Sequence, residues 1–281
     1  MRDIIDAICE VVKNPMYKLK DHYIGRNRAN SMGESLETYI KDIFAGTVNI
    51  NDIDVRMQML SDTFSYLGNT NNPPDSIIRG SIAIEVKKIE SNDSSLALNS
   101  SYPKPKLYSN SSMISTACRE CEEWIEKDML YCVGVVKGSY LKSLSFVYGE
   151  DYCANKEVYE RIKTTIKNGV ESISNVEFAE TNELGRVNRV DPLGITYLRV
   201  RGMWGIENPF KVFSRIYKRD YSMDFNFMAI INDSQMQKLG NLNRLTDLQK
   251  EYPTLSITKV KIPDPNNLAI FKGATLITYK I

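Results

Sequence analysis

The stretch from Pro74 to Lys87 constrains the fold of this chain more than any other part of the sequence. Two short apolar runs, Ile77–Ile78 and Ile82–Ile89, lie on either side of an Arg79-Gly80 pair that can turn the chain. Strand side chains point alternately to the two faces of a sheet, so charged residues within such a run can share one face. The stretch therefore predicts a β-hairpin with a charged face.

Three charged side chains of this hairpin are expected to meet. Glu85 and Lys87 fall on one strand face and Ile84 and Val86 on the other, and pairing of the two runs brings Asp75 toward Glu85. Two carboxylates and one ammonium on a rigid sheet can hold Mg²⁺ and position a water molecule beside a phosphodiester. The ion prefers oxygen ligands, polarises the phosphoryl group and lowers the pKa of the water. The pattern predicts a nuclease site.

The spacing of Asp75, Glu85 and Lys87 resembles that of the PD-(D/E)XK nuclease superfamily. This resemblance implies an α/β fold in which a mixed β-sheet is flanked by helices and has the site at its edge. The expected order of elements, helix, strand, strand, helix, strand and helix, agrees with such a layered arrangement. The motif is degenerate, and a surface-charged hairpin at a sheet edge gives the same pattern.

A helix is predicted from Ser31 to Gly46. Ser31 and Glu34 have the spacing of a capping box, and Gly46 is suited to end the helix. Glu37 lies one position off the apolar stripe of this helix. Many nucleases of the resembled superfamily place an extra carboxylate on the helix before the sheet. The resemblance therefore implies that Glu37 supports a second ion or the water shell of the first.

Composition excludes several other classes of protein. The chain has 281 residues, of which 42% are hydrophobic and 25% charged, as in soluble globular proteins. No apolar stretch approaches the roughly 20 residues that span a bilayer, and acids interrupt the N-terminus where a signal peptide is apolar. We expect a cytoplasmic protein. A single histidine, His22, disfavours sites built on several histidines. Cys118 and Cys121 form a C-x-x-C, which we interpret as packed thiols rather than a zinc site.

Positive charge is concentrated between Arg186 and Arg219. This segment has eight basic residues against two acidic ones, a net charge of +6 in a chain whose total is +1. Arginine, asparagine and aromatic side chains are those that contact phosphates and base edges. The candidate DNA-binding residues are Arg186, Asn188, Arg189, Arg199 and Arg201. A solvated charged face is the alternative interpretation.

The polar stretch from Ser91 to Ser115 follows the hairpin directly. It is interpreted as a linker or as a loop over the scissile phosphate, with Lys104 and Lys106 as phosphate contacts. Further on, helices are expected over Glu120–Lys127, from Asn155 with Val158, Ile162 and Ile166 inside, and over Leu245–Glu251. Strands are expected over Met129–Val136, Leu144–Tyr148, Ile195–Val200, Phe225–Ile231, Leu255–Ile262 and Ala274–Ile281.

A closer resemblance is to the NgoPII family of type II restriction endonucleases. The stretches that resemble it are Asn27–Gly46, Thr63–Asn69, Asn72–Ser76, Ile84–Ser91, Leu96–Lys104 and Cys118–Trp124. They cover roughly the first half of the chain. The resemblance implies Mg²⁺-dependent cleavage of double-stranded DNA at the palindrome GGCC, and a companion methyltransferase that protects host DNA. A palindromic target also implies a homodimer.

We therefore expect one restriction endonuclease domain over residues 1–281, with a catalytic core at about 28–180 and DNA recognition at about 181–281. Asp75 and Glu85 would ligate Mg²⁺, and Lys87 would orient or deprotonate the attacking water. One alternative is a structure-directed repair or recombination nuclease of the same fold. Another is a DNA-binding protein without catalysis, although such a protein gains nothing from carboxylates near phosphates.

Overall fold

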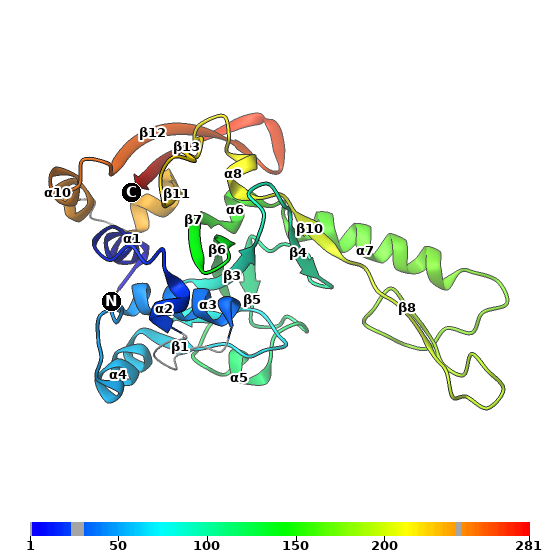
Figure 1. Ribbon diagram of the computed structural model, residues 1–281. Coiled ribbons are helices and arrows are strands. Elements are labelled where there is room, and N and C mark those ends of the chain that lie inside the picture. The colour runs from blue at the N-terminus through cyan, green and yellow to red at the C-terminus, as the bar shows by residue number, and fades with distance from the viewer. Residues whose placement is uncertain (1, 24–30, 240–242) are drawn as a thin grey trace.

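A mixed sheet of nine strands forms the centre of the molecule (Figure 1). The computed structural model describes residues 2–23, 31–239 and 243–281, without the side chains of residues 20 and 21. Residues 27–30, which include the start of the expected catalytic core, lie outside the described residues. The strands of the sheet are β1 (Phe64–Tyr66), β2 (Ser76–Ile78), β3 (Ala83–Ile89), β5 (Lys106–Tyr108), β6 (Glu126–Lys137), β7 (Tyr140–Tyr148), β11 (Asn226–Asn232), β12 (Ser256–Asp264) and β13 (Asn267–Lys280).

The strand order is β1-β2-β3-β6-β7-β11-β13-β12, with β5 paired to β6 outside this path. β3 runs parallel to β6 and β7 runs parallel to β11, whereas the other neighbours are antiparallel. β11, β12 and β13 come after residue 180, so residues from both expected parts of the chain build one continuous sheet. The prediction of an α/β fold with a mixed sheet flanked by helices is confirmed.

Helices cover both faces of this sheet. They are α1 (Ile4–Lys13), α2 (Leu19–Tyr23), α3 (Met32–Ala45), α4 (Ile53–Thr63), α5 (Thr116–Arg119), α6 (Gly149–Tyr152), α7 (Lys156–Glu171), α8 (Pro209–Val212), α9 (Asp233–Leu239) and α10 (Asn243–Glu251). Two apolar cores result. Ile84 of β3 packs into the core beneath α1 and α3, and its neighbour Ala83 packs into the core of the opposite face.

The helix predicted from Ser31 to Gly46 is confirmed as α3. Its N-cap residue Ser31 accepts a hydrogen bond from the N–H of Glu34 at 3.2 Å, and Gly46 ends the helix with a φ of +72°. Glycine tolerates this left-handed conformation at no steric cost. The buried side of α3, with Leu36, Ile40 and Ile43 fully buried, packs against the sheet next to α1.

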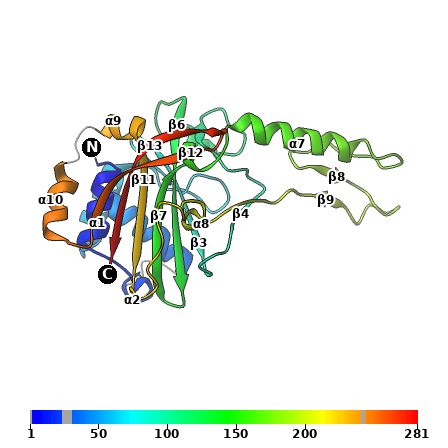
Figure 2. The ribbon, with the colours of Figure 1, turned by 90° about the horizontal axis from the view of Figure 1, so that it is seen from above.

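An arm extends from one side of the sheet (Figures 1 and 2). It consists of α7 and a hairpin of β8 (Gly185–Val187) and β9 (Leu198–Val200). The chain returns to the body through β10 (Trp204–Ile206), which pairs with β4 (Leu96–Asn99). The segment from residue 155 to residue 206 therefore leaves the sheet and comes back to it beside the strand that follows β3.

The structure corrects two sequence-based expectations. The helix expected from Asn155 is confirmed as α7, but its residues Val158, Ile162 and Ile166 are 37%, 39% and 47% exposed, because α7 stands away from the sheet and buries no residue. Glu120–Lys127 is not helical. α5 ends at Arg119, and pairing of β5 with β6 draws the chain into the sheet from Glu126 onward. Among the described helices, none is long and apolar enough to cross a membrane.

Candidate active site

The hairpin predicted from Pro74 to Lys87 is confirmed. β2 and β3 pair antiparallel, with Ser76 opposite Ile84, and the N–H of Asp75 donates to the carbonyl of Ile84 at 3.0 Å. The N–H of Val86 in turn donates to Oδ2 of Asp75 at 2.6 Å. Asp75 is therefore fixed to the strand that contains Glu85.

Glu85 and Lys87 share one face of β3, as expected. The Lys87 Nζ donates to Oε1 of Glu85 at 2.5 Å, and the two side chains are 26% and 12% exposed. The alternate residues Ile84 and Val86 pack into the core on the other face. β3 pairs with β6 from Ala83 to Ile89 and with β2 at Ala83 and Ile84, so backbone hydrogen bonds hold the strand that presents the cluster.

Charges within this cluster shift the pKa values of Asp75 and Lys87. Burial, and after it the charge of Glu85, raise the pKa of Asp75 to about 7 against the opposing effects of Lys87 and the Val86 N–H. Burial by itself lowers the pKa of Lys87, but the charges of Glu85 and Asp75 outweigh it and raise that pKa overall. The two carboxylates are thus held together against electrostatic repulsion, which a bound metal cation would relieve.

Gly68 allows the chain to approach Asp75 closely. Its φ is +84°, and a Cβ there would collide with the carbonyl oxygen of Asp75. A larger residue would displace the backbone that positions the Asp75 carboxylate. The stretch Thr63–Asn69, which resembles the restriction endonuclease family, therefore contributes directly to the shape of the site.

The residues fit a hard divalent cation. The Oε2 atom of Glu85 is buried and has no hydrogen-bond partner within the described part of the chain. A buried carboxylate oxygen of this kind is costly unless a ligand completes it. No group of three or more His, Cys, Asp or Glu side chains suited to a metal occurs among the described residues. Asp75 and Glu85 alone match Mg²⁺, which commonly binds one or two carboxylates together with water and substrate phosphate.

Glu37 approaches the cluster from α3 but is paired with another residue. Its carboxylate accepts a hydrogen bond from Lys41 at 2.5 Å, one helical turn away, and Lys41 also donates to the carbonyl of Leu67 at 2.8 Å. The charge of Glu37 still contributes to the raised pKa values of Asp75 and Lys87, less than Glu85 does. Glu37 thus lies close enough to influence Asp75 and Lys87 while its carboxylate binds Lys41.

An open cleft of about 600 Å³ contains the cluster of Asp75, Glu85 and Lys87. Segments far apart in the sequence form its walls: 69–73, 98–101, Met113, Arg201 and Met203. Arg201, which is 56% exposed, comes from the arm and faces the same cleft as Asp75, Glu85 and Lys87. Of the five candidate DNA-binding residues of the basic segment, it is the one that lines this cleft.

The other four candidates lie on the hairpin of the arm. Arg186 of β8 and Arg199 of β9 are cross-strand neighbours, and Nε of Arg186 donates to Oδ1 of Asn188 at 2.8 Å. Arg189 has a φ of +53° at the turn. Glu183 pairs with both Arg199 and Arg201, at 2.5 and 2.9 Å. Glu183, which precedes the basic segment in the chain, therefore lowers the net positive charge of this part of the folded surface.

Lys104 and Lys106, the other candidate phosphate contacts, have different environments. Lys104 is only 8% exposed and its Nζ contacts Oγ of Ser101. Burial lowers the pKa of Lys104 to about 8, although the charge of Glu85 opposes this effect. Lys106 pairs with Glu126, and Asp128 is 3.8 Å away.

Cys118, Cys121 and His22 do not line the cleft that contains Asp75, Glu85 and Lys87. Cys118 is buried, and Sγ of Cys121 contacts Oγ of Ser65 at 3.7 Å. Burial raises the pKa of Cys118 to about 12, so its thiol is protonated at neutral pH. His22 contacts the carbonyl of Val48 at 3.2 Å.

The fold and the acid–acid–lysine cluster in an open cleft define a nuclease of the restriction endonuclease class. A model of the NgoPII restriction endonuclease family matches residues 2–263. The type II restriction enzyme NgoPII of Neisseria gonorrhoeae is 52% identical over 280 residues, which are 99% of this chain and 100% of the relative. The chain belongs to the NgoPII restriction endonuclease family. The family prediction is confirmed over nearly the whole chain, and no matching solved structure was found.

Sequence reasoning missed two groups of residues, one in this cleft and one in a neighbouring cleft that shares Ser100, Ser101 and Met113 with it. One is the polar wall formed by Asn69 and Asn72, whose amides are held by Tyr66 and Met113. The other is a row of lysines on α7: Lys156, Lys163 and Lys167. A signal for the second group exists, since lysines spaced by seven and four residues share one helix face.

Proposed function

We propose that this protein is a type II restriction endonuclease that hydrolyses double-stranded DNA with Mg²⁺ at a short palindrome. The observation that supports the metal dependence most directly is the buried, unpartnered Oε2 atom of Glu85 beside Asp75. The family supports a restriction activity. The resemblance suggests GGCC as the target sequence.

Each residue of the cluster has a distinct role in this proposal. Asp75 and Glu85 hold the ion, which polarises the scissile phosphoryl group and lowers the pKa of the attacking water when it is bound. Lys87 orients this water and stabilises the negative charge that develops on the phosphate. Glu37 supports the water shell of the ion from α3. Hydrolysis by in-line attack leaves a 5′-phosphate and a 3′-hydroxyl.

We propose that the protein cuts as a homodimer. A palindrome presents the same half-site twice, and two-fold symmetry is the simplest arrangement that meets it with one gene product. The arm offers a surface for such contact: Val158, Ile162 and Ile166 form an exposed apolar stripe along α7. A second copy of the chain is the occupant we assign to this stripe. A companion methyltransferase that modifies the same DNA site completes the system.

Digestion of plasmid DNA tests the proposed function. Wild-type protein with Mg²⁺ should give discrete fragments, and sequencing their ends should place every cut at GGCC. Mn²⁺ should replace Mg²⁺, whereas Ca²⁺, which takes larger and looser coordination, should not. Discrete fragments with another end sequence would contradict the GGCC assignment only. A smear, or cuts confined to junctions and mismatches, would contradict a restriction enzyme.

A further inference from the structure

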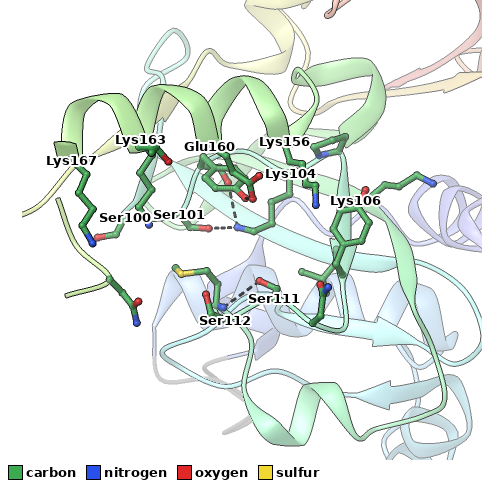
Figure 3. Close-up of a pocket in the computed structure, with 18 of the residues that line it drawn as sticks. Ser100, Ser101, Lys104, Lys106, Ser111, Ser112, Lys156, Glu160, Lys163 and Lys167 are labelled. Carbon is green, nitrogen blue, oxygen red and sulfur yellow. Dashed lines mark hydrogen bonds between the residues drawn. The ribbon is translucent and has the colours of Figure 1, made fainter. Parts of the chain in front are cut away.

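A second cleft, also of about 600 Å³, is shown in Figure 3. One wall is α7, and the other is formed by residues 100–113 around β5. Figure 3 shows the lysine side chains of α7 extending toward this second wall. None of the α7 residues has a place in the chemistry described above.

Positive charge dominates the lining of this cleft. Five lysines line it against one glutamate: Lys104, Lys106, Lys156, Lys163 and Lys167, with Glu160. Glu160, on α7, accepts a hydrogen bond at 3.0 Å from the hydroxyl of Tyr102, which lies on the opposite wall of the cleft. An excess of like charge in a concave surface attracts anions.

Lys163 is the clearest candidate to bind an anion. Within the described residues it forms no ion pair, whereas Lys167 pairs with Glu171 at 3.6 Å and donates to the carbonyl of Thr181 at 2.7 Å. The Nζ of Lys156 lies 4.6 Å from the ring centre of Tyr108. The charge of Lys163, after burial and the charge of Lys87, contributes to the lowered pKa of Lys104 across the cleft. Two ammonium groups thus repel each other where a bound anion would relieve the repulsion.

The second cleft adjoins the one that contains Asp75, Glu85 and Lys87, the catalytic cleft. Ser100, Ser101 and Met113 line both of them. Lys156 and Lys167 are eleven residues apart on α7, which corresponds to about 16 Å along the helix axis. A row of this length exceeds the size of one phosphate group and suits a polymer with repeated charges.

We propose that this cleft binds the phosphodiester backbone of the DNA that flanks the cleaved sequence, with Lys163 and Lys156 as phosphate contacts. The inference rests on the proposed function, because it requires a DNA strand bound in the catalytic cleft. Such a strand would pass Ser100 and Ser101 and enter the second cleft. The contacts involve phosphates and not base edges, so they position the duplex and do not select its sequence.

A test compares Lys163→Gln and the double variant Lys156→Gln, Lys163→Gln with wild type and with Arg161→Gln. Arg161 is an exposed cation of the same helix that does not line the cleft. Binding is measured without divalent ions as a function of salt, on a long duplex with a central site and on one trimmed to the site. Thermal melts confirm that each variant is folded.

On the long duplex, each lost contact should make the slope of log affinity against log salt shallower by about 0.9. Between 50 and 200 mM salt, the loss of affinity should then be roughly threefold smaller than for wild type. The change should be the same for cognate and non-cognate long duplexes and absent on the trimmed one, and Arg161→Gln should match wild type. Wild-type slopes in both variants would overturn the proposal, as would an equal loss on the trimmed duplex.

Parallel digestion by wild-type protein with Mg²⁺ separates this inference from the proposed function. If wild type cuts at a defined site while both lysine variants retain its salt dependence, the second cleft does not bind DNA and the proposed function stands. If wild type neither cuts nor binds any duplex, both fail together. Binding that depends on the lysines, without any cleavage by wild type, would support the cleft and contradict the nuclease.

Discussion

The Oδ2 atom of Asp75 accepts a hydrogen bond from the backbone N–H of Val86, 2.6 Å away. Val86 lies between Glu85 and Lys87 on β3. One bond thus fixes the carboxylate at the start of the hairpin to the strand that presents the other two charged groups. The relative positions of all three depend on the register of β2 and β3, and not on flexible loops.

Asp75→Asn should stabilise the protein in the absence of divalent ions. The variant removes a buried charge that lies beside Glu85 and whose pKa is raised to about 7. At pH 8 we expect the free energy of unfolding to rise on the order of 1–3 kcal/mol. Cleavage should be lost, while DNA binding remains. Denaturant unfolding in excess chelator measures the first effect.

The same measurement has a defined pH dependence. Between the ordinary pKa of 3.8 and the raised value of about 7, the folded protein binds more protons at Asp75 than the unfolded chain does. The contribution of Asp75 to stability is therefore fully present below pH 3.8 and is lost as pH rises through 7. The gain from Asp75→Asn should shrink as pH falls toward 4. A gain that grows as pH falls would refute a raised pKa.

Glu37→Gln should weaken the response to Mg²⁺ without abolishing cleavage. Glu37 is paired with Lys41 and influences the cluster only through its charge. We expect the Mg²⁺ concentration for half-maximal cleavage to rise roughly 10-fold, the lower end of the effect of outer-shell partners. Glu34→Gln, on the first turn of the same helix, is the control. If Glu37→Gln removes all cleavage at saturating Mg²⁺, Glu37 is itself a ligand.

Arg201→Ala should weaken binding of cognate DNA by about 1–3 kcal/mol if the guanidinium contacts a guanine edge. Its place in the catalytic cleft puts it within reach of the bound duplex. Arg199→Ala, which leaves Glu183 paired with Arg201, is the companion variant. Binding to cognate and non-cognate duplexes is compared by titration. Equal losses on both would assign a phosphate contact, and no loss from either variant would place recognition elsewhere.

Sedimentation with a cognate duplex should show two protein chains per duplex. Ile162→Ser combined with Ile166→Ser should reduce the dimer, because the exposed stripe of α7 loses its apolar side chains. Leu268→Ser, at an 89% exposed apolar residue outside the arm, should leave it unchanged. A stable complex of one chain with one duplex that still cuts both strands would refute the homodimer.

Local patterns of the sequence predicted the hairpin and its charged face. Turn residues, alternation and an apolar strand run lie within fourteen residues, so few long-range contacts are needed to specify the pairing of β2 with β3. The same holds for α3, where Ser31 and Gly46 mark both ends. The Asp75–Glu85–Lys87 cluster follows from this local geometry.

Local sequence patterns do not predict contacts between segments that are far apart in the chain. Arg201 reaches the cleft because the arm leaves the sheet after α6 and returns at β10, a path that no local pattern encodes. The apolar stripe of α7 predicts an amphipathic helix, but periodicity does not say what covers the stripe. The prediction of a helix over Glu120–Lys127 was wrong for a related reason, because pairing of Glu126 and Lys127 with β5 overrides the helical pattern.

The most direct test compares DNA cleavage by wild-type protein, Lys87→Ala and Lys88→Ala in Mg²⁺ and in excess chelator. Lys88 is the adjacent residue of β3, faces away from the cluster and pairs with Glu90. We predict that wild type and Lys88→Ala give the same discrete fragments in Mg²⁺ and none in chelator. Lys87→Ala should bind the duplex but cut it at least roughly 10²-fold more slowly. Cleavage by wild type in chelator, or wild-type rates from Lys87→Ala, would contradict the assignment of Asp75, Glu85 and Lys87 as the catalytic site.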